Sequence, residues 1–290
     1  MKRSVIFAAY DSKSVIHDYV VTYLKYLSEI SNDIIFIADC IFPESELEKI
    51  KKYVSYCKCE RHQEYDFGSY KRGYNYLLQR DGGEIKSDEV VFCNDSCFCI
   101  APLLPVFVEL ETRKCDFWGM TGSYQERRHI QSFFIVAKNT VVNSNVFNRY
   151  LNAVVHHDSY MEIVHSYEIP LLETLEKANF KGEAYAKFPA TKNNPTANPF
   201  GLLEQGVPLL KRKSLLKVKS HFNYYKTLNY IKHTEHNADV LEYYQVKSNF
   251  ALWFKMYHQK FLVPISIERF SSGRTRIRIF GIPVFFYKAK

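Results

Sequence analysis

The sequence predicts an α/β fold in which a mainly parallel sheet is flanked by helices. Short apolar segments of strand length alternate with longer amphipathic segments of helix length. Polar and mostly acidic residues follow the strand segments, as in open α/β sheets with a ligand crevice at the carboxyl ends of the strands. Hydrophobic residues make up 47% of the 290 residues, which is enough for one large core.

The elements follow in order along the chain. We expect strands at residues 4–9, 33–38, 56–60 and 89–93, and helices between them at 15–30, 43–56 and 69–78. Helix 43–56 has Pro43 at its start and three early glutamates, which suit the first turn of a helix. Further helices are expected at 103–111, 145–155 and 167–178, and further strands at 116–120 and 129–137. Four prolines between residues 189 and 208 predict a loop region that closes the domain.

Charge divides the chain into two parts. Residues 211–290 carry 16 lysines and arginines against 4 acidic residues, whereas residues 1–210 carry 23 against 27. Residues 274–287 alternate basic with apolar residues, reach a glycine and continue as a second apolar segment, which predicts a β-hairpin. We therefore expect an α/β domain over residues 1–210 and a basic, aromatic C-terminal region over residues 211–290 that meets an anionic partner.

The cysteines and the hydropathy pattern argue against a zinc protein and a membrane-spanning one. None of the seven cysteines forms a Cys-x-x-Cys pair, and Cys57, Cys59, Cys97 and Cys99 alternate as strand residues do. We therefore expect small buried side chains rather than zinc ligands. No apolar run approaches 18 residues, and the apolar start of the chain is too short for a signal peptide, so we expect a cytoplasmic protein.

Polar residues near one edge of the predicted sheet suggest an enzyme that acts on a phosphate-bearing donor. Carboxylates at strand ends can accept hydrogen bonds from a ribose or a base, and cations near a helix start can reach phosphate. The candidates are Tyr10, Asp11, Asp39, Lys71 and Arg72, together with Asp66, Gly68 and Ser69 of an acidic loop that would open the next helix. The alternatives are ordinary acidic loop residues and a solvated helix face.

The triplet Asn94-Asp95-Ser96 follows the fourth strand. We expect Asp95 to hold Mg²⁺ or Mn²⁺ against diphosphate oxygens, with Asn94 and Ser96 beside it. The alternative is a turn residue that ends the strand. Transfer from a donor also requires a base for the acceptor hydroxyl, and Glu168 at a helix start is the first candidate, with Asp116 the second.

An acceptor site is expected near Trp118 and the strand after it. Aromatic faces stack on sugar rings, and an amide can bind two hydroxyls. The candidates are Trp118, His129, Gln131 and Ser132. The alternative is that Trp118 belongs to the core, because Phe117 and Trp118 alternate faces and one of them must point inward.

Several of these segments together carry a resemblance. Tyr65-Asp66-Phe67-Gly68-Ser69, Asn94-Asp95-Ser96 and Asp116-Phe117-Trp118-Gly119 occur in this order, and with Ala9-Tyr10-Asp11 and the segment 129–134 they resemble the rhamnan synthesis protein F family of bacterial polysaccharide glycosyltransferases. The resemblance spans residues 1–215. It implies a GT-A-like fold, a nucleotide-sugar donor such as dTDP-rhamnose or UDP-galactofuranose, and a lipid-linked cell-surface glycan as acceptor. Only one carboxylate stands where the usual Asp-x-Asp motif has two, which leaves metal dependence open.

Two hypotheses of different class follow. The first is an inverting hexosyltransferase that docks on the anionic inner face of the membrane through its basic C-terminal region. The second is a non-catalytic glycan- or nucleotide-binding partner in a polysaccharide assembly complex. We do not expect a nucleic-acid partner, because no recognition motif accompanies the alternating Arg274, Arg276 and Arg278. A homodimer formed through the terminal hairpin stays an alternative role for that segment.

Overall fold

The computed structural model describes residues 1–31, 33–186, 198–214, 221–234 and 240, and three strands between residues 265 and 288. The chain divides into two compact units, Met1–Asn237 and Ala238–Lys290. The division falls later than the boundary after Leu210 that the charge pattern suggested. Of the proline-rich loop region expected at 189–208, residues 189–197 lie outside the described residues, and Pro199–Leu203 form a short helix rather than a loop.

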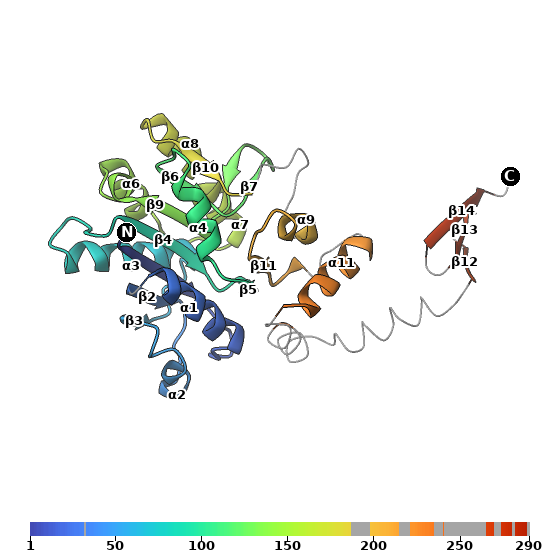
Figure 1. The fold of residues 1–290 in the computed structure, drawn as a ribbon, viewed down its shortest axis with the longest axis horizontal. Coiled ribbons are helices and arrows are strands. Elements are labelled where there is room, and N and C mark those ends of the chain that lie inside the picture. Colours follow the sequence, from blue (N-terminus) through green and yellow to red (C-terminus); the bar gives the residue numbers. More distant parts are fainter. Residues whose placement is uncertain are drawn as a thin grey trace. The chain divides into compact units, whose positions relative to one another are not determined.

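The first unit is built on a seven-stranded sheet with the order β10-β6-β9-β4-β1-β2-β3 (Figure 1). Neighbouring strands are parallel except at β9, which runs antiparallel to both β4 and β6. The strands are β1 (Arg3–Ala9), β2 (Asp33–Ala38), β3 (Tyr56–Cys59), β4 (Glu89–Asn94), β6 (Phe117–Gly119), β9 (Phe134–Lys138) and β10 (Gly182–Ala184). The predicted α/β fold with a mainly parallel sheet is confirmed.

Helices cover both faces of this sheet. The helices described in the first unit are α1 (Asp18–Ile30), α2 (Glu44–Glu48), α3 (Tyr65–Arg80), α4 (Leu104–Glu111), α5 (Asn139–Val142), α6 (Asn145–Asn152), α7 (Tyr160–Ile163), the π-helix η1 (Val164–Glu168), α8 (Ile169–Lys177), α9 (Pro199–Leu203) and α11 (His221–Lys232). Alternation along β1 assigns the faces, since Ile6 joins the core cluster that contains residues of α3, α6 and α8, whereas Phe7 packs edge-on against Tyr23 of α1. The whole of β1 is buried, as expected for a central parallel strand.

Three expected elements differ clearly from those observed. The helix expected at 43–56 extends only over Glu44–Glu48. The segment from Asp66 to Ser69 is not a loop: it forms the first turn of α3, which begins at Tyr65. Gly68 permits this turn, because a Cβ there would overlap the Cβ of Glu64. The single strand expected at 129–137 is divided into β8 (His129–Ile130) and β9, with Gln131 to Phe133 between them.

A second, two-stranded sheet contains the start of the basic segment, within the first unit. Strand β11 (Leu209–Lys211) pairs antiparallel with β5 (Cys97–Cys99), so that Lys211 lies opposite Cys97. The backbone N–H of Arg212 continues the pairing by donating to the carbonyl of Ser96 at 2.8 Å. Residues 209–212 are therefore fixed beside the Asn94-Asp95-Ser96 triplet. A third, small sheet pairs β7 (Gly122–Ser123) antiparallel with β8.

The second unit contains three antiparallel strands, β12 (Ile265–Arg269), β13 (Arg274–Ile279) and β14 (Ile282–Lys288). Strands β13 and β14 pair antiparallel in the segment where the hairpin is expected, and Gly281 between them lies outside the described residues. Within the described residues, no helix is long and apolar enough to cross a bilayer.

The cysteine prediction is confirmed for one pair and wrong for part of the other. Cys97 and Cys99 are buried on β5. Cys57 is exposed on β3 and Cys59 is partly buried, because β3 is an edge strand of the large sheet. Their Sγ atoms lie 3.7 Å apart.

Candidate functional site

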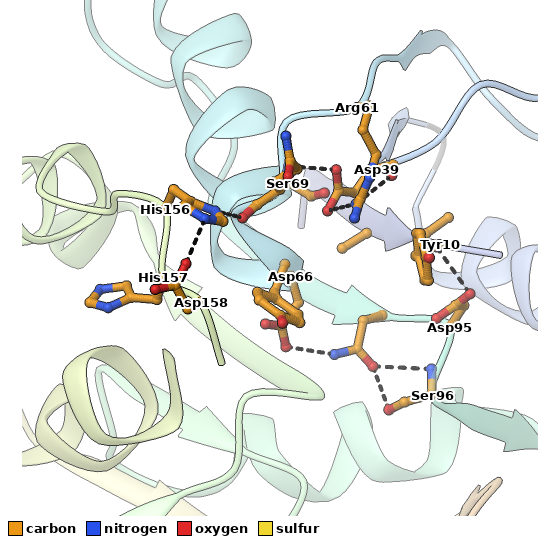
Figure 2. Close-up of a pocket in the computed structure, with 15 residues that line it drawn as sticks. Tyr10, Asp39, Arg61, Asp66, Ser69, Asp95, Ser96, His156, His157 and Asp158 are labelled. Atoms are coloured by element: carbon orange, nitrogen blue, oxygen red, sulfur yellow. Dashed lines mark hydrogen bonds and ion pairs between the residues drawn. The ribbon is translucent and has the colours of Figure 1, made fainter. Parts of the chain in front are cut away.

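A cavity of about 520 Å³ opens at the carboxyl ends of β1, β2 and β4. Figure 2 shows its side chains facing one another, with His156 to Asp158 on one side and Tyr10 and Asp95 on the other. The lining residues that carry polar groups are Tyr10, Asp39, Arg61, Gln63, Tyr65, Asp66, Ser69, Asn94, Asp95, Ser96, His156, His157 and Asp158. The position agrees with the crevice that parallel sheets leave at their strand ends.

Asp39 organises one wall of this cavity. It is buried at the end of β2, and its Oδ1 accepts hydrogen bonds from the backbone N–H groups of His62 and Gln63, both at 2.8 Å. Its Oδ2 lies 2.7 Å from the guanidinium of Arg61 (Figure 2). The same guanidinium lies 5.2 Å from the ring centre of Tyr10, which is 45% exposed. Asp39 therefore positions a cation and an aromatic face at the cavity.

The loop that Asp39 fixes has unusual backbone geometry. Gln63 and Tyr65, both in the cavity lining, adopt positive φ angles of 59° and 55°. Such conformations are uncommon for residues other than glycine and are concentrated at functional sites. Asp11, in contrast, does not line the cavity: its Oδ1 accepts from the N–H of Lys13 at 2.8 Å and so closes the turn after β1. Its expected nucleoside contact is replaced by this structural role.

Two carboxylates meet at the hydroxyl of Ser132. Glu168 Oε2 accepts hydrogen bonds from the backbone N–H and the hydroxyl of Ser132, at 2.8 and 2.5 Å. Asp66 Oδ2 lies 3.3 Å from the same hydroxyl and accepts from the amide of Asn94 at 2.9 Å. Burial first, and then the negative charge of Glu168, raise the pKa of Asp66. The break between β8 and β9 makes this arrangement possible, because it frees the N–H of Ser132 from the sheet.

A second cavity of about 330 Å³ adjoins the first and shares Asn94 and Ser96 with it. Its lining includes three of the expected residues, Glu168, His129 and Gln131. His129 is buried, with its Nε2 4.0 Å from Glu168 Oε1. The lining also includes Lys211, Arg212 and Lys213, which the charge pattern had assigned to a separate C-terminal region.

The side chains around Asp95 do not fit a divalent cation. A guanidinium nitrogen of Arg212 lies 3.6 Å from Oδ1 of Asp95, and the N–H of Tyr10 donates to Oδ2 at 3.2 Å. Both neighbours present positive charge or a donor to a carboxylate that a metal would need for itself. Among the described residues, no three or more His, Cys, Asp and Glu side chains are grouped so that they could hold an ion.

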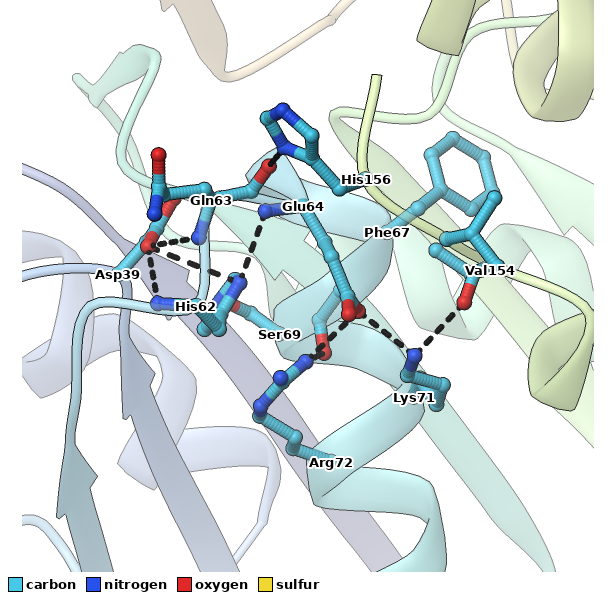
Figure 3. A network of polar contacts seen from close by, with 12 residues as sticks. Asp39, His62, Gln63, Glu64, Phe67, Ser69, Lys71, Arg72, Val154 and His156 are labelled. Atoms are coloured by element: carbon cyan, nitrogen blue, oxygen red, sulfur yellow. Dashed lines mark hydrogen bonds and ion pairs between the residues drawn. The ribbon is translucent and has the colours of Figure 1, made fainter. Parts of the chain in front are cut away.

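Neither Lys71 nor Arg72 belongs to the lining of either cavity. Figure 3 shows both side chains directed to Glu64 instead. Lys71 Nζ binds Glu64 and the carbonyl of Val154, both at 2.7 Å. Arg72 binds Glu64 and Glu60, each at 2.8 Å. These two residues therefore do not lie where they could make the phosphate contact that the sequence suggested. Their charges hold the start of α3 in place instead.

Two further expectations are corrected by position. Trp118 is 4% exposed and packs against Phe107 and Phe134, with ring centres 5.3 and 5.8 Å apart, so that it belongs to the core. Asp116 precedes β6, which runs parallel to β4, and therefore lies at the edge of the sheet opposite the cavities. It accepts a hydrogen bond from the N–H of Lys181 at 2.8 Å.

Sequence reasoning missed several lining residues. Arg61 and Gln63 lie in the segment between β3 and α3, and His156 to Asp158 lie after α6. His156 Nδ1 is 2.6 Å from the carbonyl of Gln63, which links the two segments. The one available signal was the dense polar composition of residues 60–64 directly after an expected strand. Nothing local marked residues 156–158, because they reach the cavity only through tertiary packing.

Comparison with known proteins adds the family. A model described as rhamnan synthesis protein F matches residues 34–280. The chain belongs to this family. The expected family resemblance is thus confirmed over most of the chain.

Individual proteins resemble this chain over a short stretch or at low sequence identity. The chain is 31% identical over 111 residues to the "Virulence protein VirA" of Vibrio anguillarum, a stretch that covers 38% of this chain and 35% of that protein. The chain thus aligns with about a third of the length of this curated relative. Among solved structures, a 4-diphosphocytidyl-2C-methyl-D-erythritol synthase has a TM-score of 0.39 at 10% identity, covering 71% of this chain and 99% of its own. The core-mannan synthase A of Aspergillus fumigatus in its Mn/GDP form has a TM-score of 0.32 at 11% identity, covering 75% and 72%.

Proposed function

We propose that this member of the rhamnan synthesis protein F family is a GT-A-like glycosyltransferase that moves a sugar from a nucleotide-sugar donor to a glycan hydroxyl. One observation carries the proposal: two cavities of different character adjoin at Asn94 and Ser96. A transferase needs a donor site and an acceptor site that meet where the bond is exchanged.

The larger cavity suits the nucleoside of the donor. Its volume of about 520 Å³ lies within the range of small-molecule sites. The exposed ring of Tyr10 offers a stacking face for a base, and the carboxylate of Asp39 or the amide of Gln63 can bind ribose hydroxyls. We propose dTDP or UDP as the nucleotide and a rhamnose- or galactofuranose-type sugar, as the family resemblance implies.

The smaller cavity suits the acceptor. Glu168 is the proposed general base, because its carboxylate lines this cavity while Ser132 holds it in place. As the acceptor oxygen bonds to the anomeric carbon, its proton passes to Glu168. The bond from the anomeric carbon to the diphosphate oxygen breaks, and its electron pair leaves with the nucleoside diphosphate. Attack on the face opposite the leaving group inverts the anomeric configuration. We propose that Gln131 and His129, which line this cavity, bind acceptor hydroxyls and that the acceptor is lipid-linked.

The alternative is a non-catalytic binding partner in an assembly complex. The cluster of Asp66, Ser132 and Glu168 argues for catalysis. Two carboxylates on one largely buried hydroxyl have a cost in desolvation and repulsion that binding alone does not require. A binding module would bind nucleotide sugars without hydrolysing or transferring them.

A nucleotide panel tests the proposal. Thermal unfolding is measured with UDP, dTDP, GDP and the corresponding nucleotide sugars, because a ligand that binds only the folded state raises the melting temperature. We expect UDP or dTDP to raise it, and Asp39→Asn to reduce the increase. Asp116→Asn, at the opposite edge of the sheet, is the matched control and should leave the increase unchanged. If no nucleotide shifts the wild-type transition, a nucleotide-dependent function is wrong.

A further inference from the structure

The segment Lys211-Arg212-Lys213 is placed beside the proposed reaction centre by its backbone. Lys211 pairs with Cys97 in the sheet of β11 and β5, and the N–H of Arg212 binds the carbonyl of Ser96. The side chains of all three residues line the smaller cavity. Three consecutive cations therefore face a cavity whose other walls include Glu168 and Ser96.

Arg212 is held in a defined orientation. Its Nη1 donates to the hydroxyl of Tyr19 at 2.7 Å, and its Nη2 lies 3.6 Å from Asp95. The Tyr19 hydroxyl in turn donates to the carbonyl of Asp95 at 3.1 Å. The Arg212 side chain is 20% exposed and that of Asp95 is 14% exposed, so both charges are largely removed from water. In such surroundings a cation attracts an anion more strongly than it does at an open surface.

Lys211 is held in a similar way. Its Nζ lies 3.1 Å from the hydroxyl of Ser96 and 4.3 Å from the ring centre of Phe133. Ser96 bonds Asn94, and Asn94 bonds Asp66, so a continuous polar chain links Lys211 to the carboxylate cluster. This cation therefore lies where the two cavities adjoin, which is where a bond between donor and acceptor would be exchanged.

We propose that Arg212 and Lys211 bind the diphosphate of the donor and neutralise the charge that develops on it when the sugar leaves. The inference rests on the proposed transferase function and adds the residues that contact the leaving group. A guanidinium presents five donors in a planar fork, so that it can hold a carboxylate and a phosphate together, and an ammonium adds a compact second charge. These two side chains supply, in the chain itself, the charge neutralisation for which a divalent cation would otherwise serve.

The geometry argues against the role first expected for these residues. A basic segment that docks on an anionic membrane needs its cations at the surface. Lys211 and Arg212 are instead partly buried, and their partners are Ser96, Asp95 and Tyr19.

The test compares nucleotides that differ by one phosphate. Isothermal titration of the full chain in EDTA measures the affinities for UDP and UMP, and for dTDP and dTMP. We expect the wild-type chain to prefer the diphosphate about tenfold or more, as a charge-assisted contact with phosphate provides. Arg212→Met and Lys211→Met should each remove most of this preference while leaving monophosphate affinity unchanged. Arg212→Lys should retain part of it, which a purely structural partner of Asp95 would not explain.

Controls separate this proposal from the function on which it rests. Lys177→Met removes an exposed charge at the end of α8, outside the linings of both cavities, and should keep the full preference. A preference that survives the double substitution of Lys211 and Arg212, or that appears only when Mg²⁺ or Mn²⁺ is added, overturns the proposal and leaves the transferase function standing.

A competition experiment tests the identity of the ligand, with farnesyl diphosphate as the probe for a lipid diphosphate. If farnesyl diphosphate displaces UDP at concentrations below those of UDP itself, the nucleotide assignment is wrong. If the wild-type chain binds no nucleotide, both proposals fall. The wild-type preference and the metal comparison do not depend on whether a variant folds.

Discussion

Two Lys-Arg pairs of this protein, Lys71-Arg72 and Lys211-Arg212, have opposite surroundings. The first lies on α3 among Glu60, Glu64 and backbone carbonyls, outside both cavities. The second follows β11 and lines the smaller cavity. Sequence reasoning placed the first at phosphate and the second at a membrane. The comparison teaches that the role of a cation is set by the groups across from it in space.

Two carboxylates, Glu64 and Glu168, also differ in their surroundings. Glu64 is held between Lys71 and Arg72, which lower its pKa against the opposing effect of burial and leave it no role at the cavity. Glu168 accepts hydrogen bonds from Ser132, has a nitrogen of His129 at 4.0 Å, and lines a cavity. Glu168 therefore lies at a cavity, whereas Glu64 is enclosed by its two cations.

The largest effect is expected for Glu168→Gln. Removal of a general base lowers turnover by roughly 10²- to 10⁴-fold, because the acceptor hydroxyl then attacks without losing its proton. Donor affinity should not change. Sugar transfer from a radiolabelled nucleotide sugar measures the turnover. Glu173→Gln, on the exposed side of α8, is the control and should retain wild-type turnover. Full activity of Glu168→Gln would assign the proton to another group.

The next effect separates the two cationic pairs. Arg72→Met leaves Glu60 without its strongest partner and Glu64 with Lys71 alone, so we expect the free energy of unfolding to fall by about 1–3 kcal/mol. Nucleotide affinity should stay at the wild-type value. Urea unfolding and isothermal titration measure the two quantities. Lys51→Met removes an exposed ion pair and should change stability by less than about 0.5 kcal/mol. A loss of nucleotide affinity at unchanged stability would return Lys71 and Arg72 to the binding site.

The free energy of unfolding is expected to depend on pH through His62, which lies beside Glu64. Burial lowers the pKa of His62 from 6.5 to about 4, and its Nδ1 accepts from the N–H of Glu64. Between these pH values the unfolded chain binds a proton that the folded chain refuses. The contribution of His62 is therefore complete above about pH 6.5 and is lost as the pH falls towards 4, by up to about 3 kcal/mol. Unfolding free energies of the wild type and His62→Gln across this range measure the difference. An exposed control, His233→Gln, should follow the wild type, and parallel curves for all three would contradict the prediction.

The smallest effect concerns the second unit. Residues 238–290 carry nine lysines and arginines against three acidic residues, so we propose that this unit docks on an anionic membrane surface. Sedimentation with phosphatidylserine-containing vesicles should detect binding at low salt that weakens as salt rises. Truncation after Asn237 should abolish it, whereas truncation after Leu210 would also remove Lys211 and Arg212 from the cavity. Binding that survives truncation after Asn237 would place the contact in the first unit.

Much of the site edge could be predicted from the sequence. Asp39, Asn94 and Asp95 follow apolar segments of strand length, and parallel strands bring their carboxyl ends to one edge. The same rule puts Asp116 at the opposite edge, because this residue stands at the start of its strand and not at its end. Ser132 and Glu168 were predicted separately, and their contact could not be, since it depends on a break in the strand that no local signal marks.

The sequence by itself determined the α/β class, the central strands and the family motifs. The spacing of apolar residues and the polar residues that follow each strand depend only on residues close together in the chain. Only the tertiary structure decided which charges serve the site. Lys211 and Arg212 reach Ser96 and Asp95 through the pairing of β11 with β5, two strands more than a hundred residues apart. Lys71 and Arg72 are drawn away from it by Glu60 and Glu64. An ion pair depends on distance in space, and the fold sets that distance.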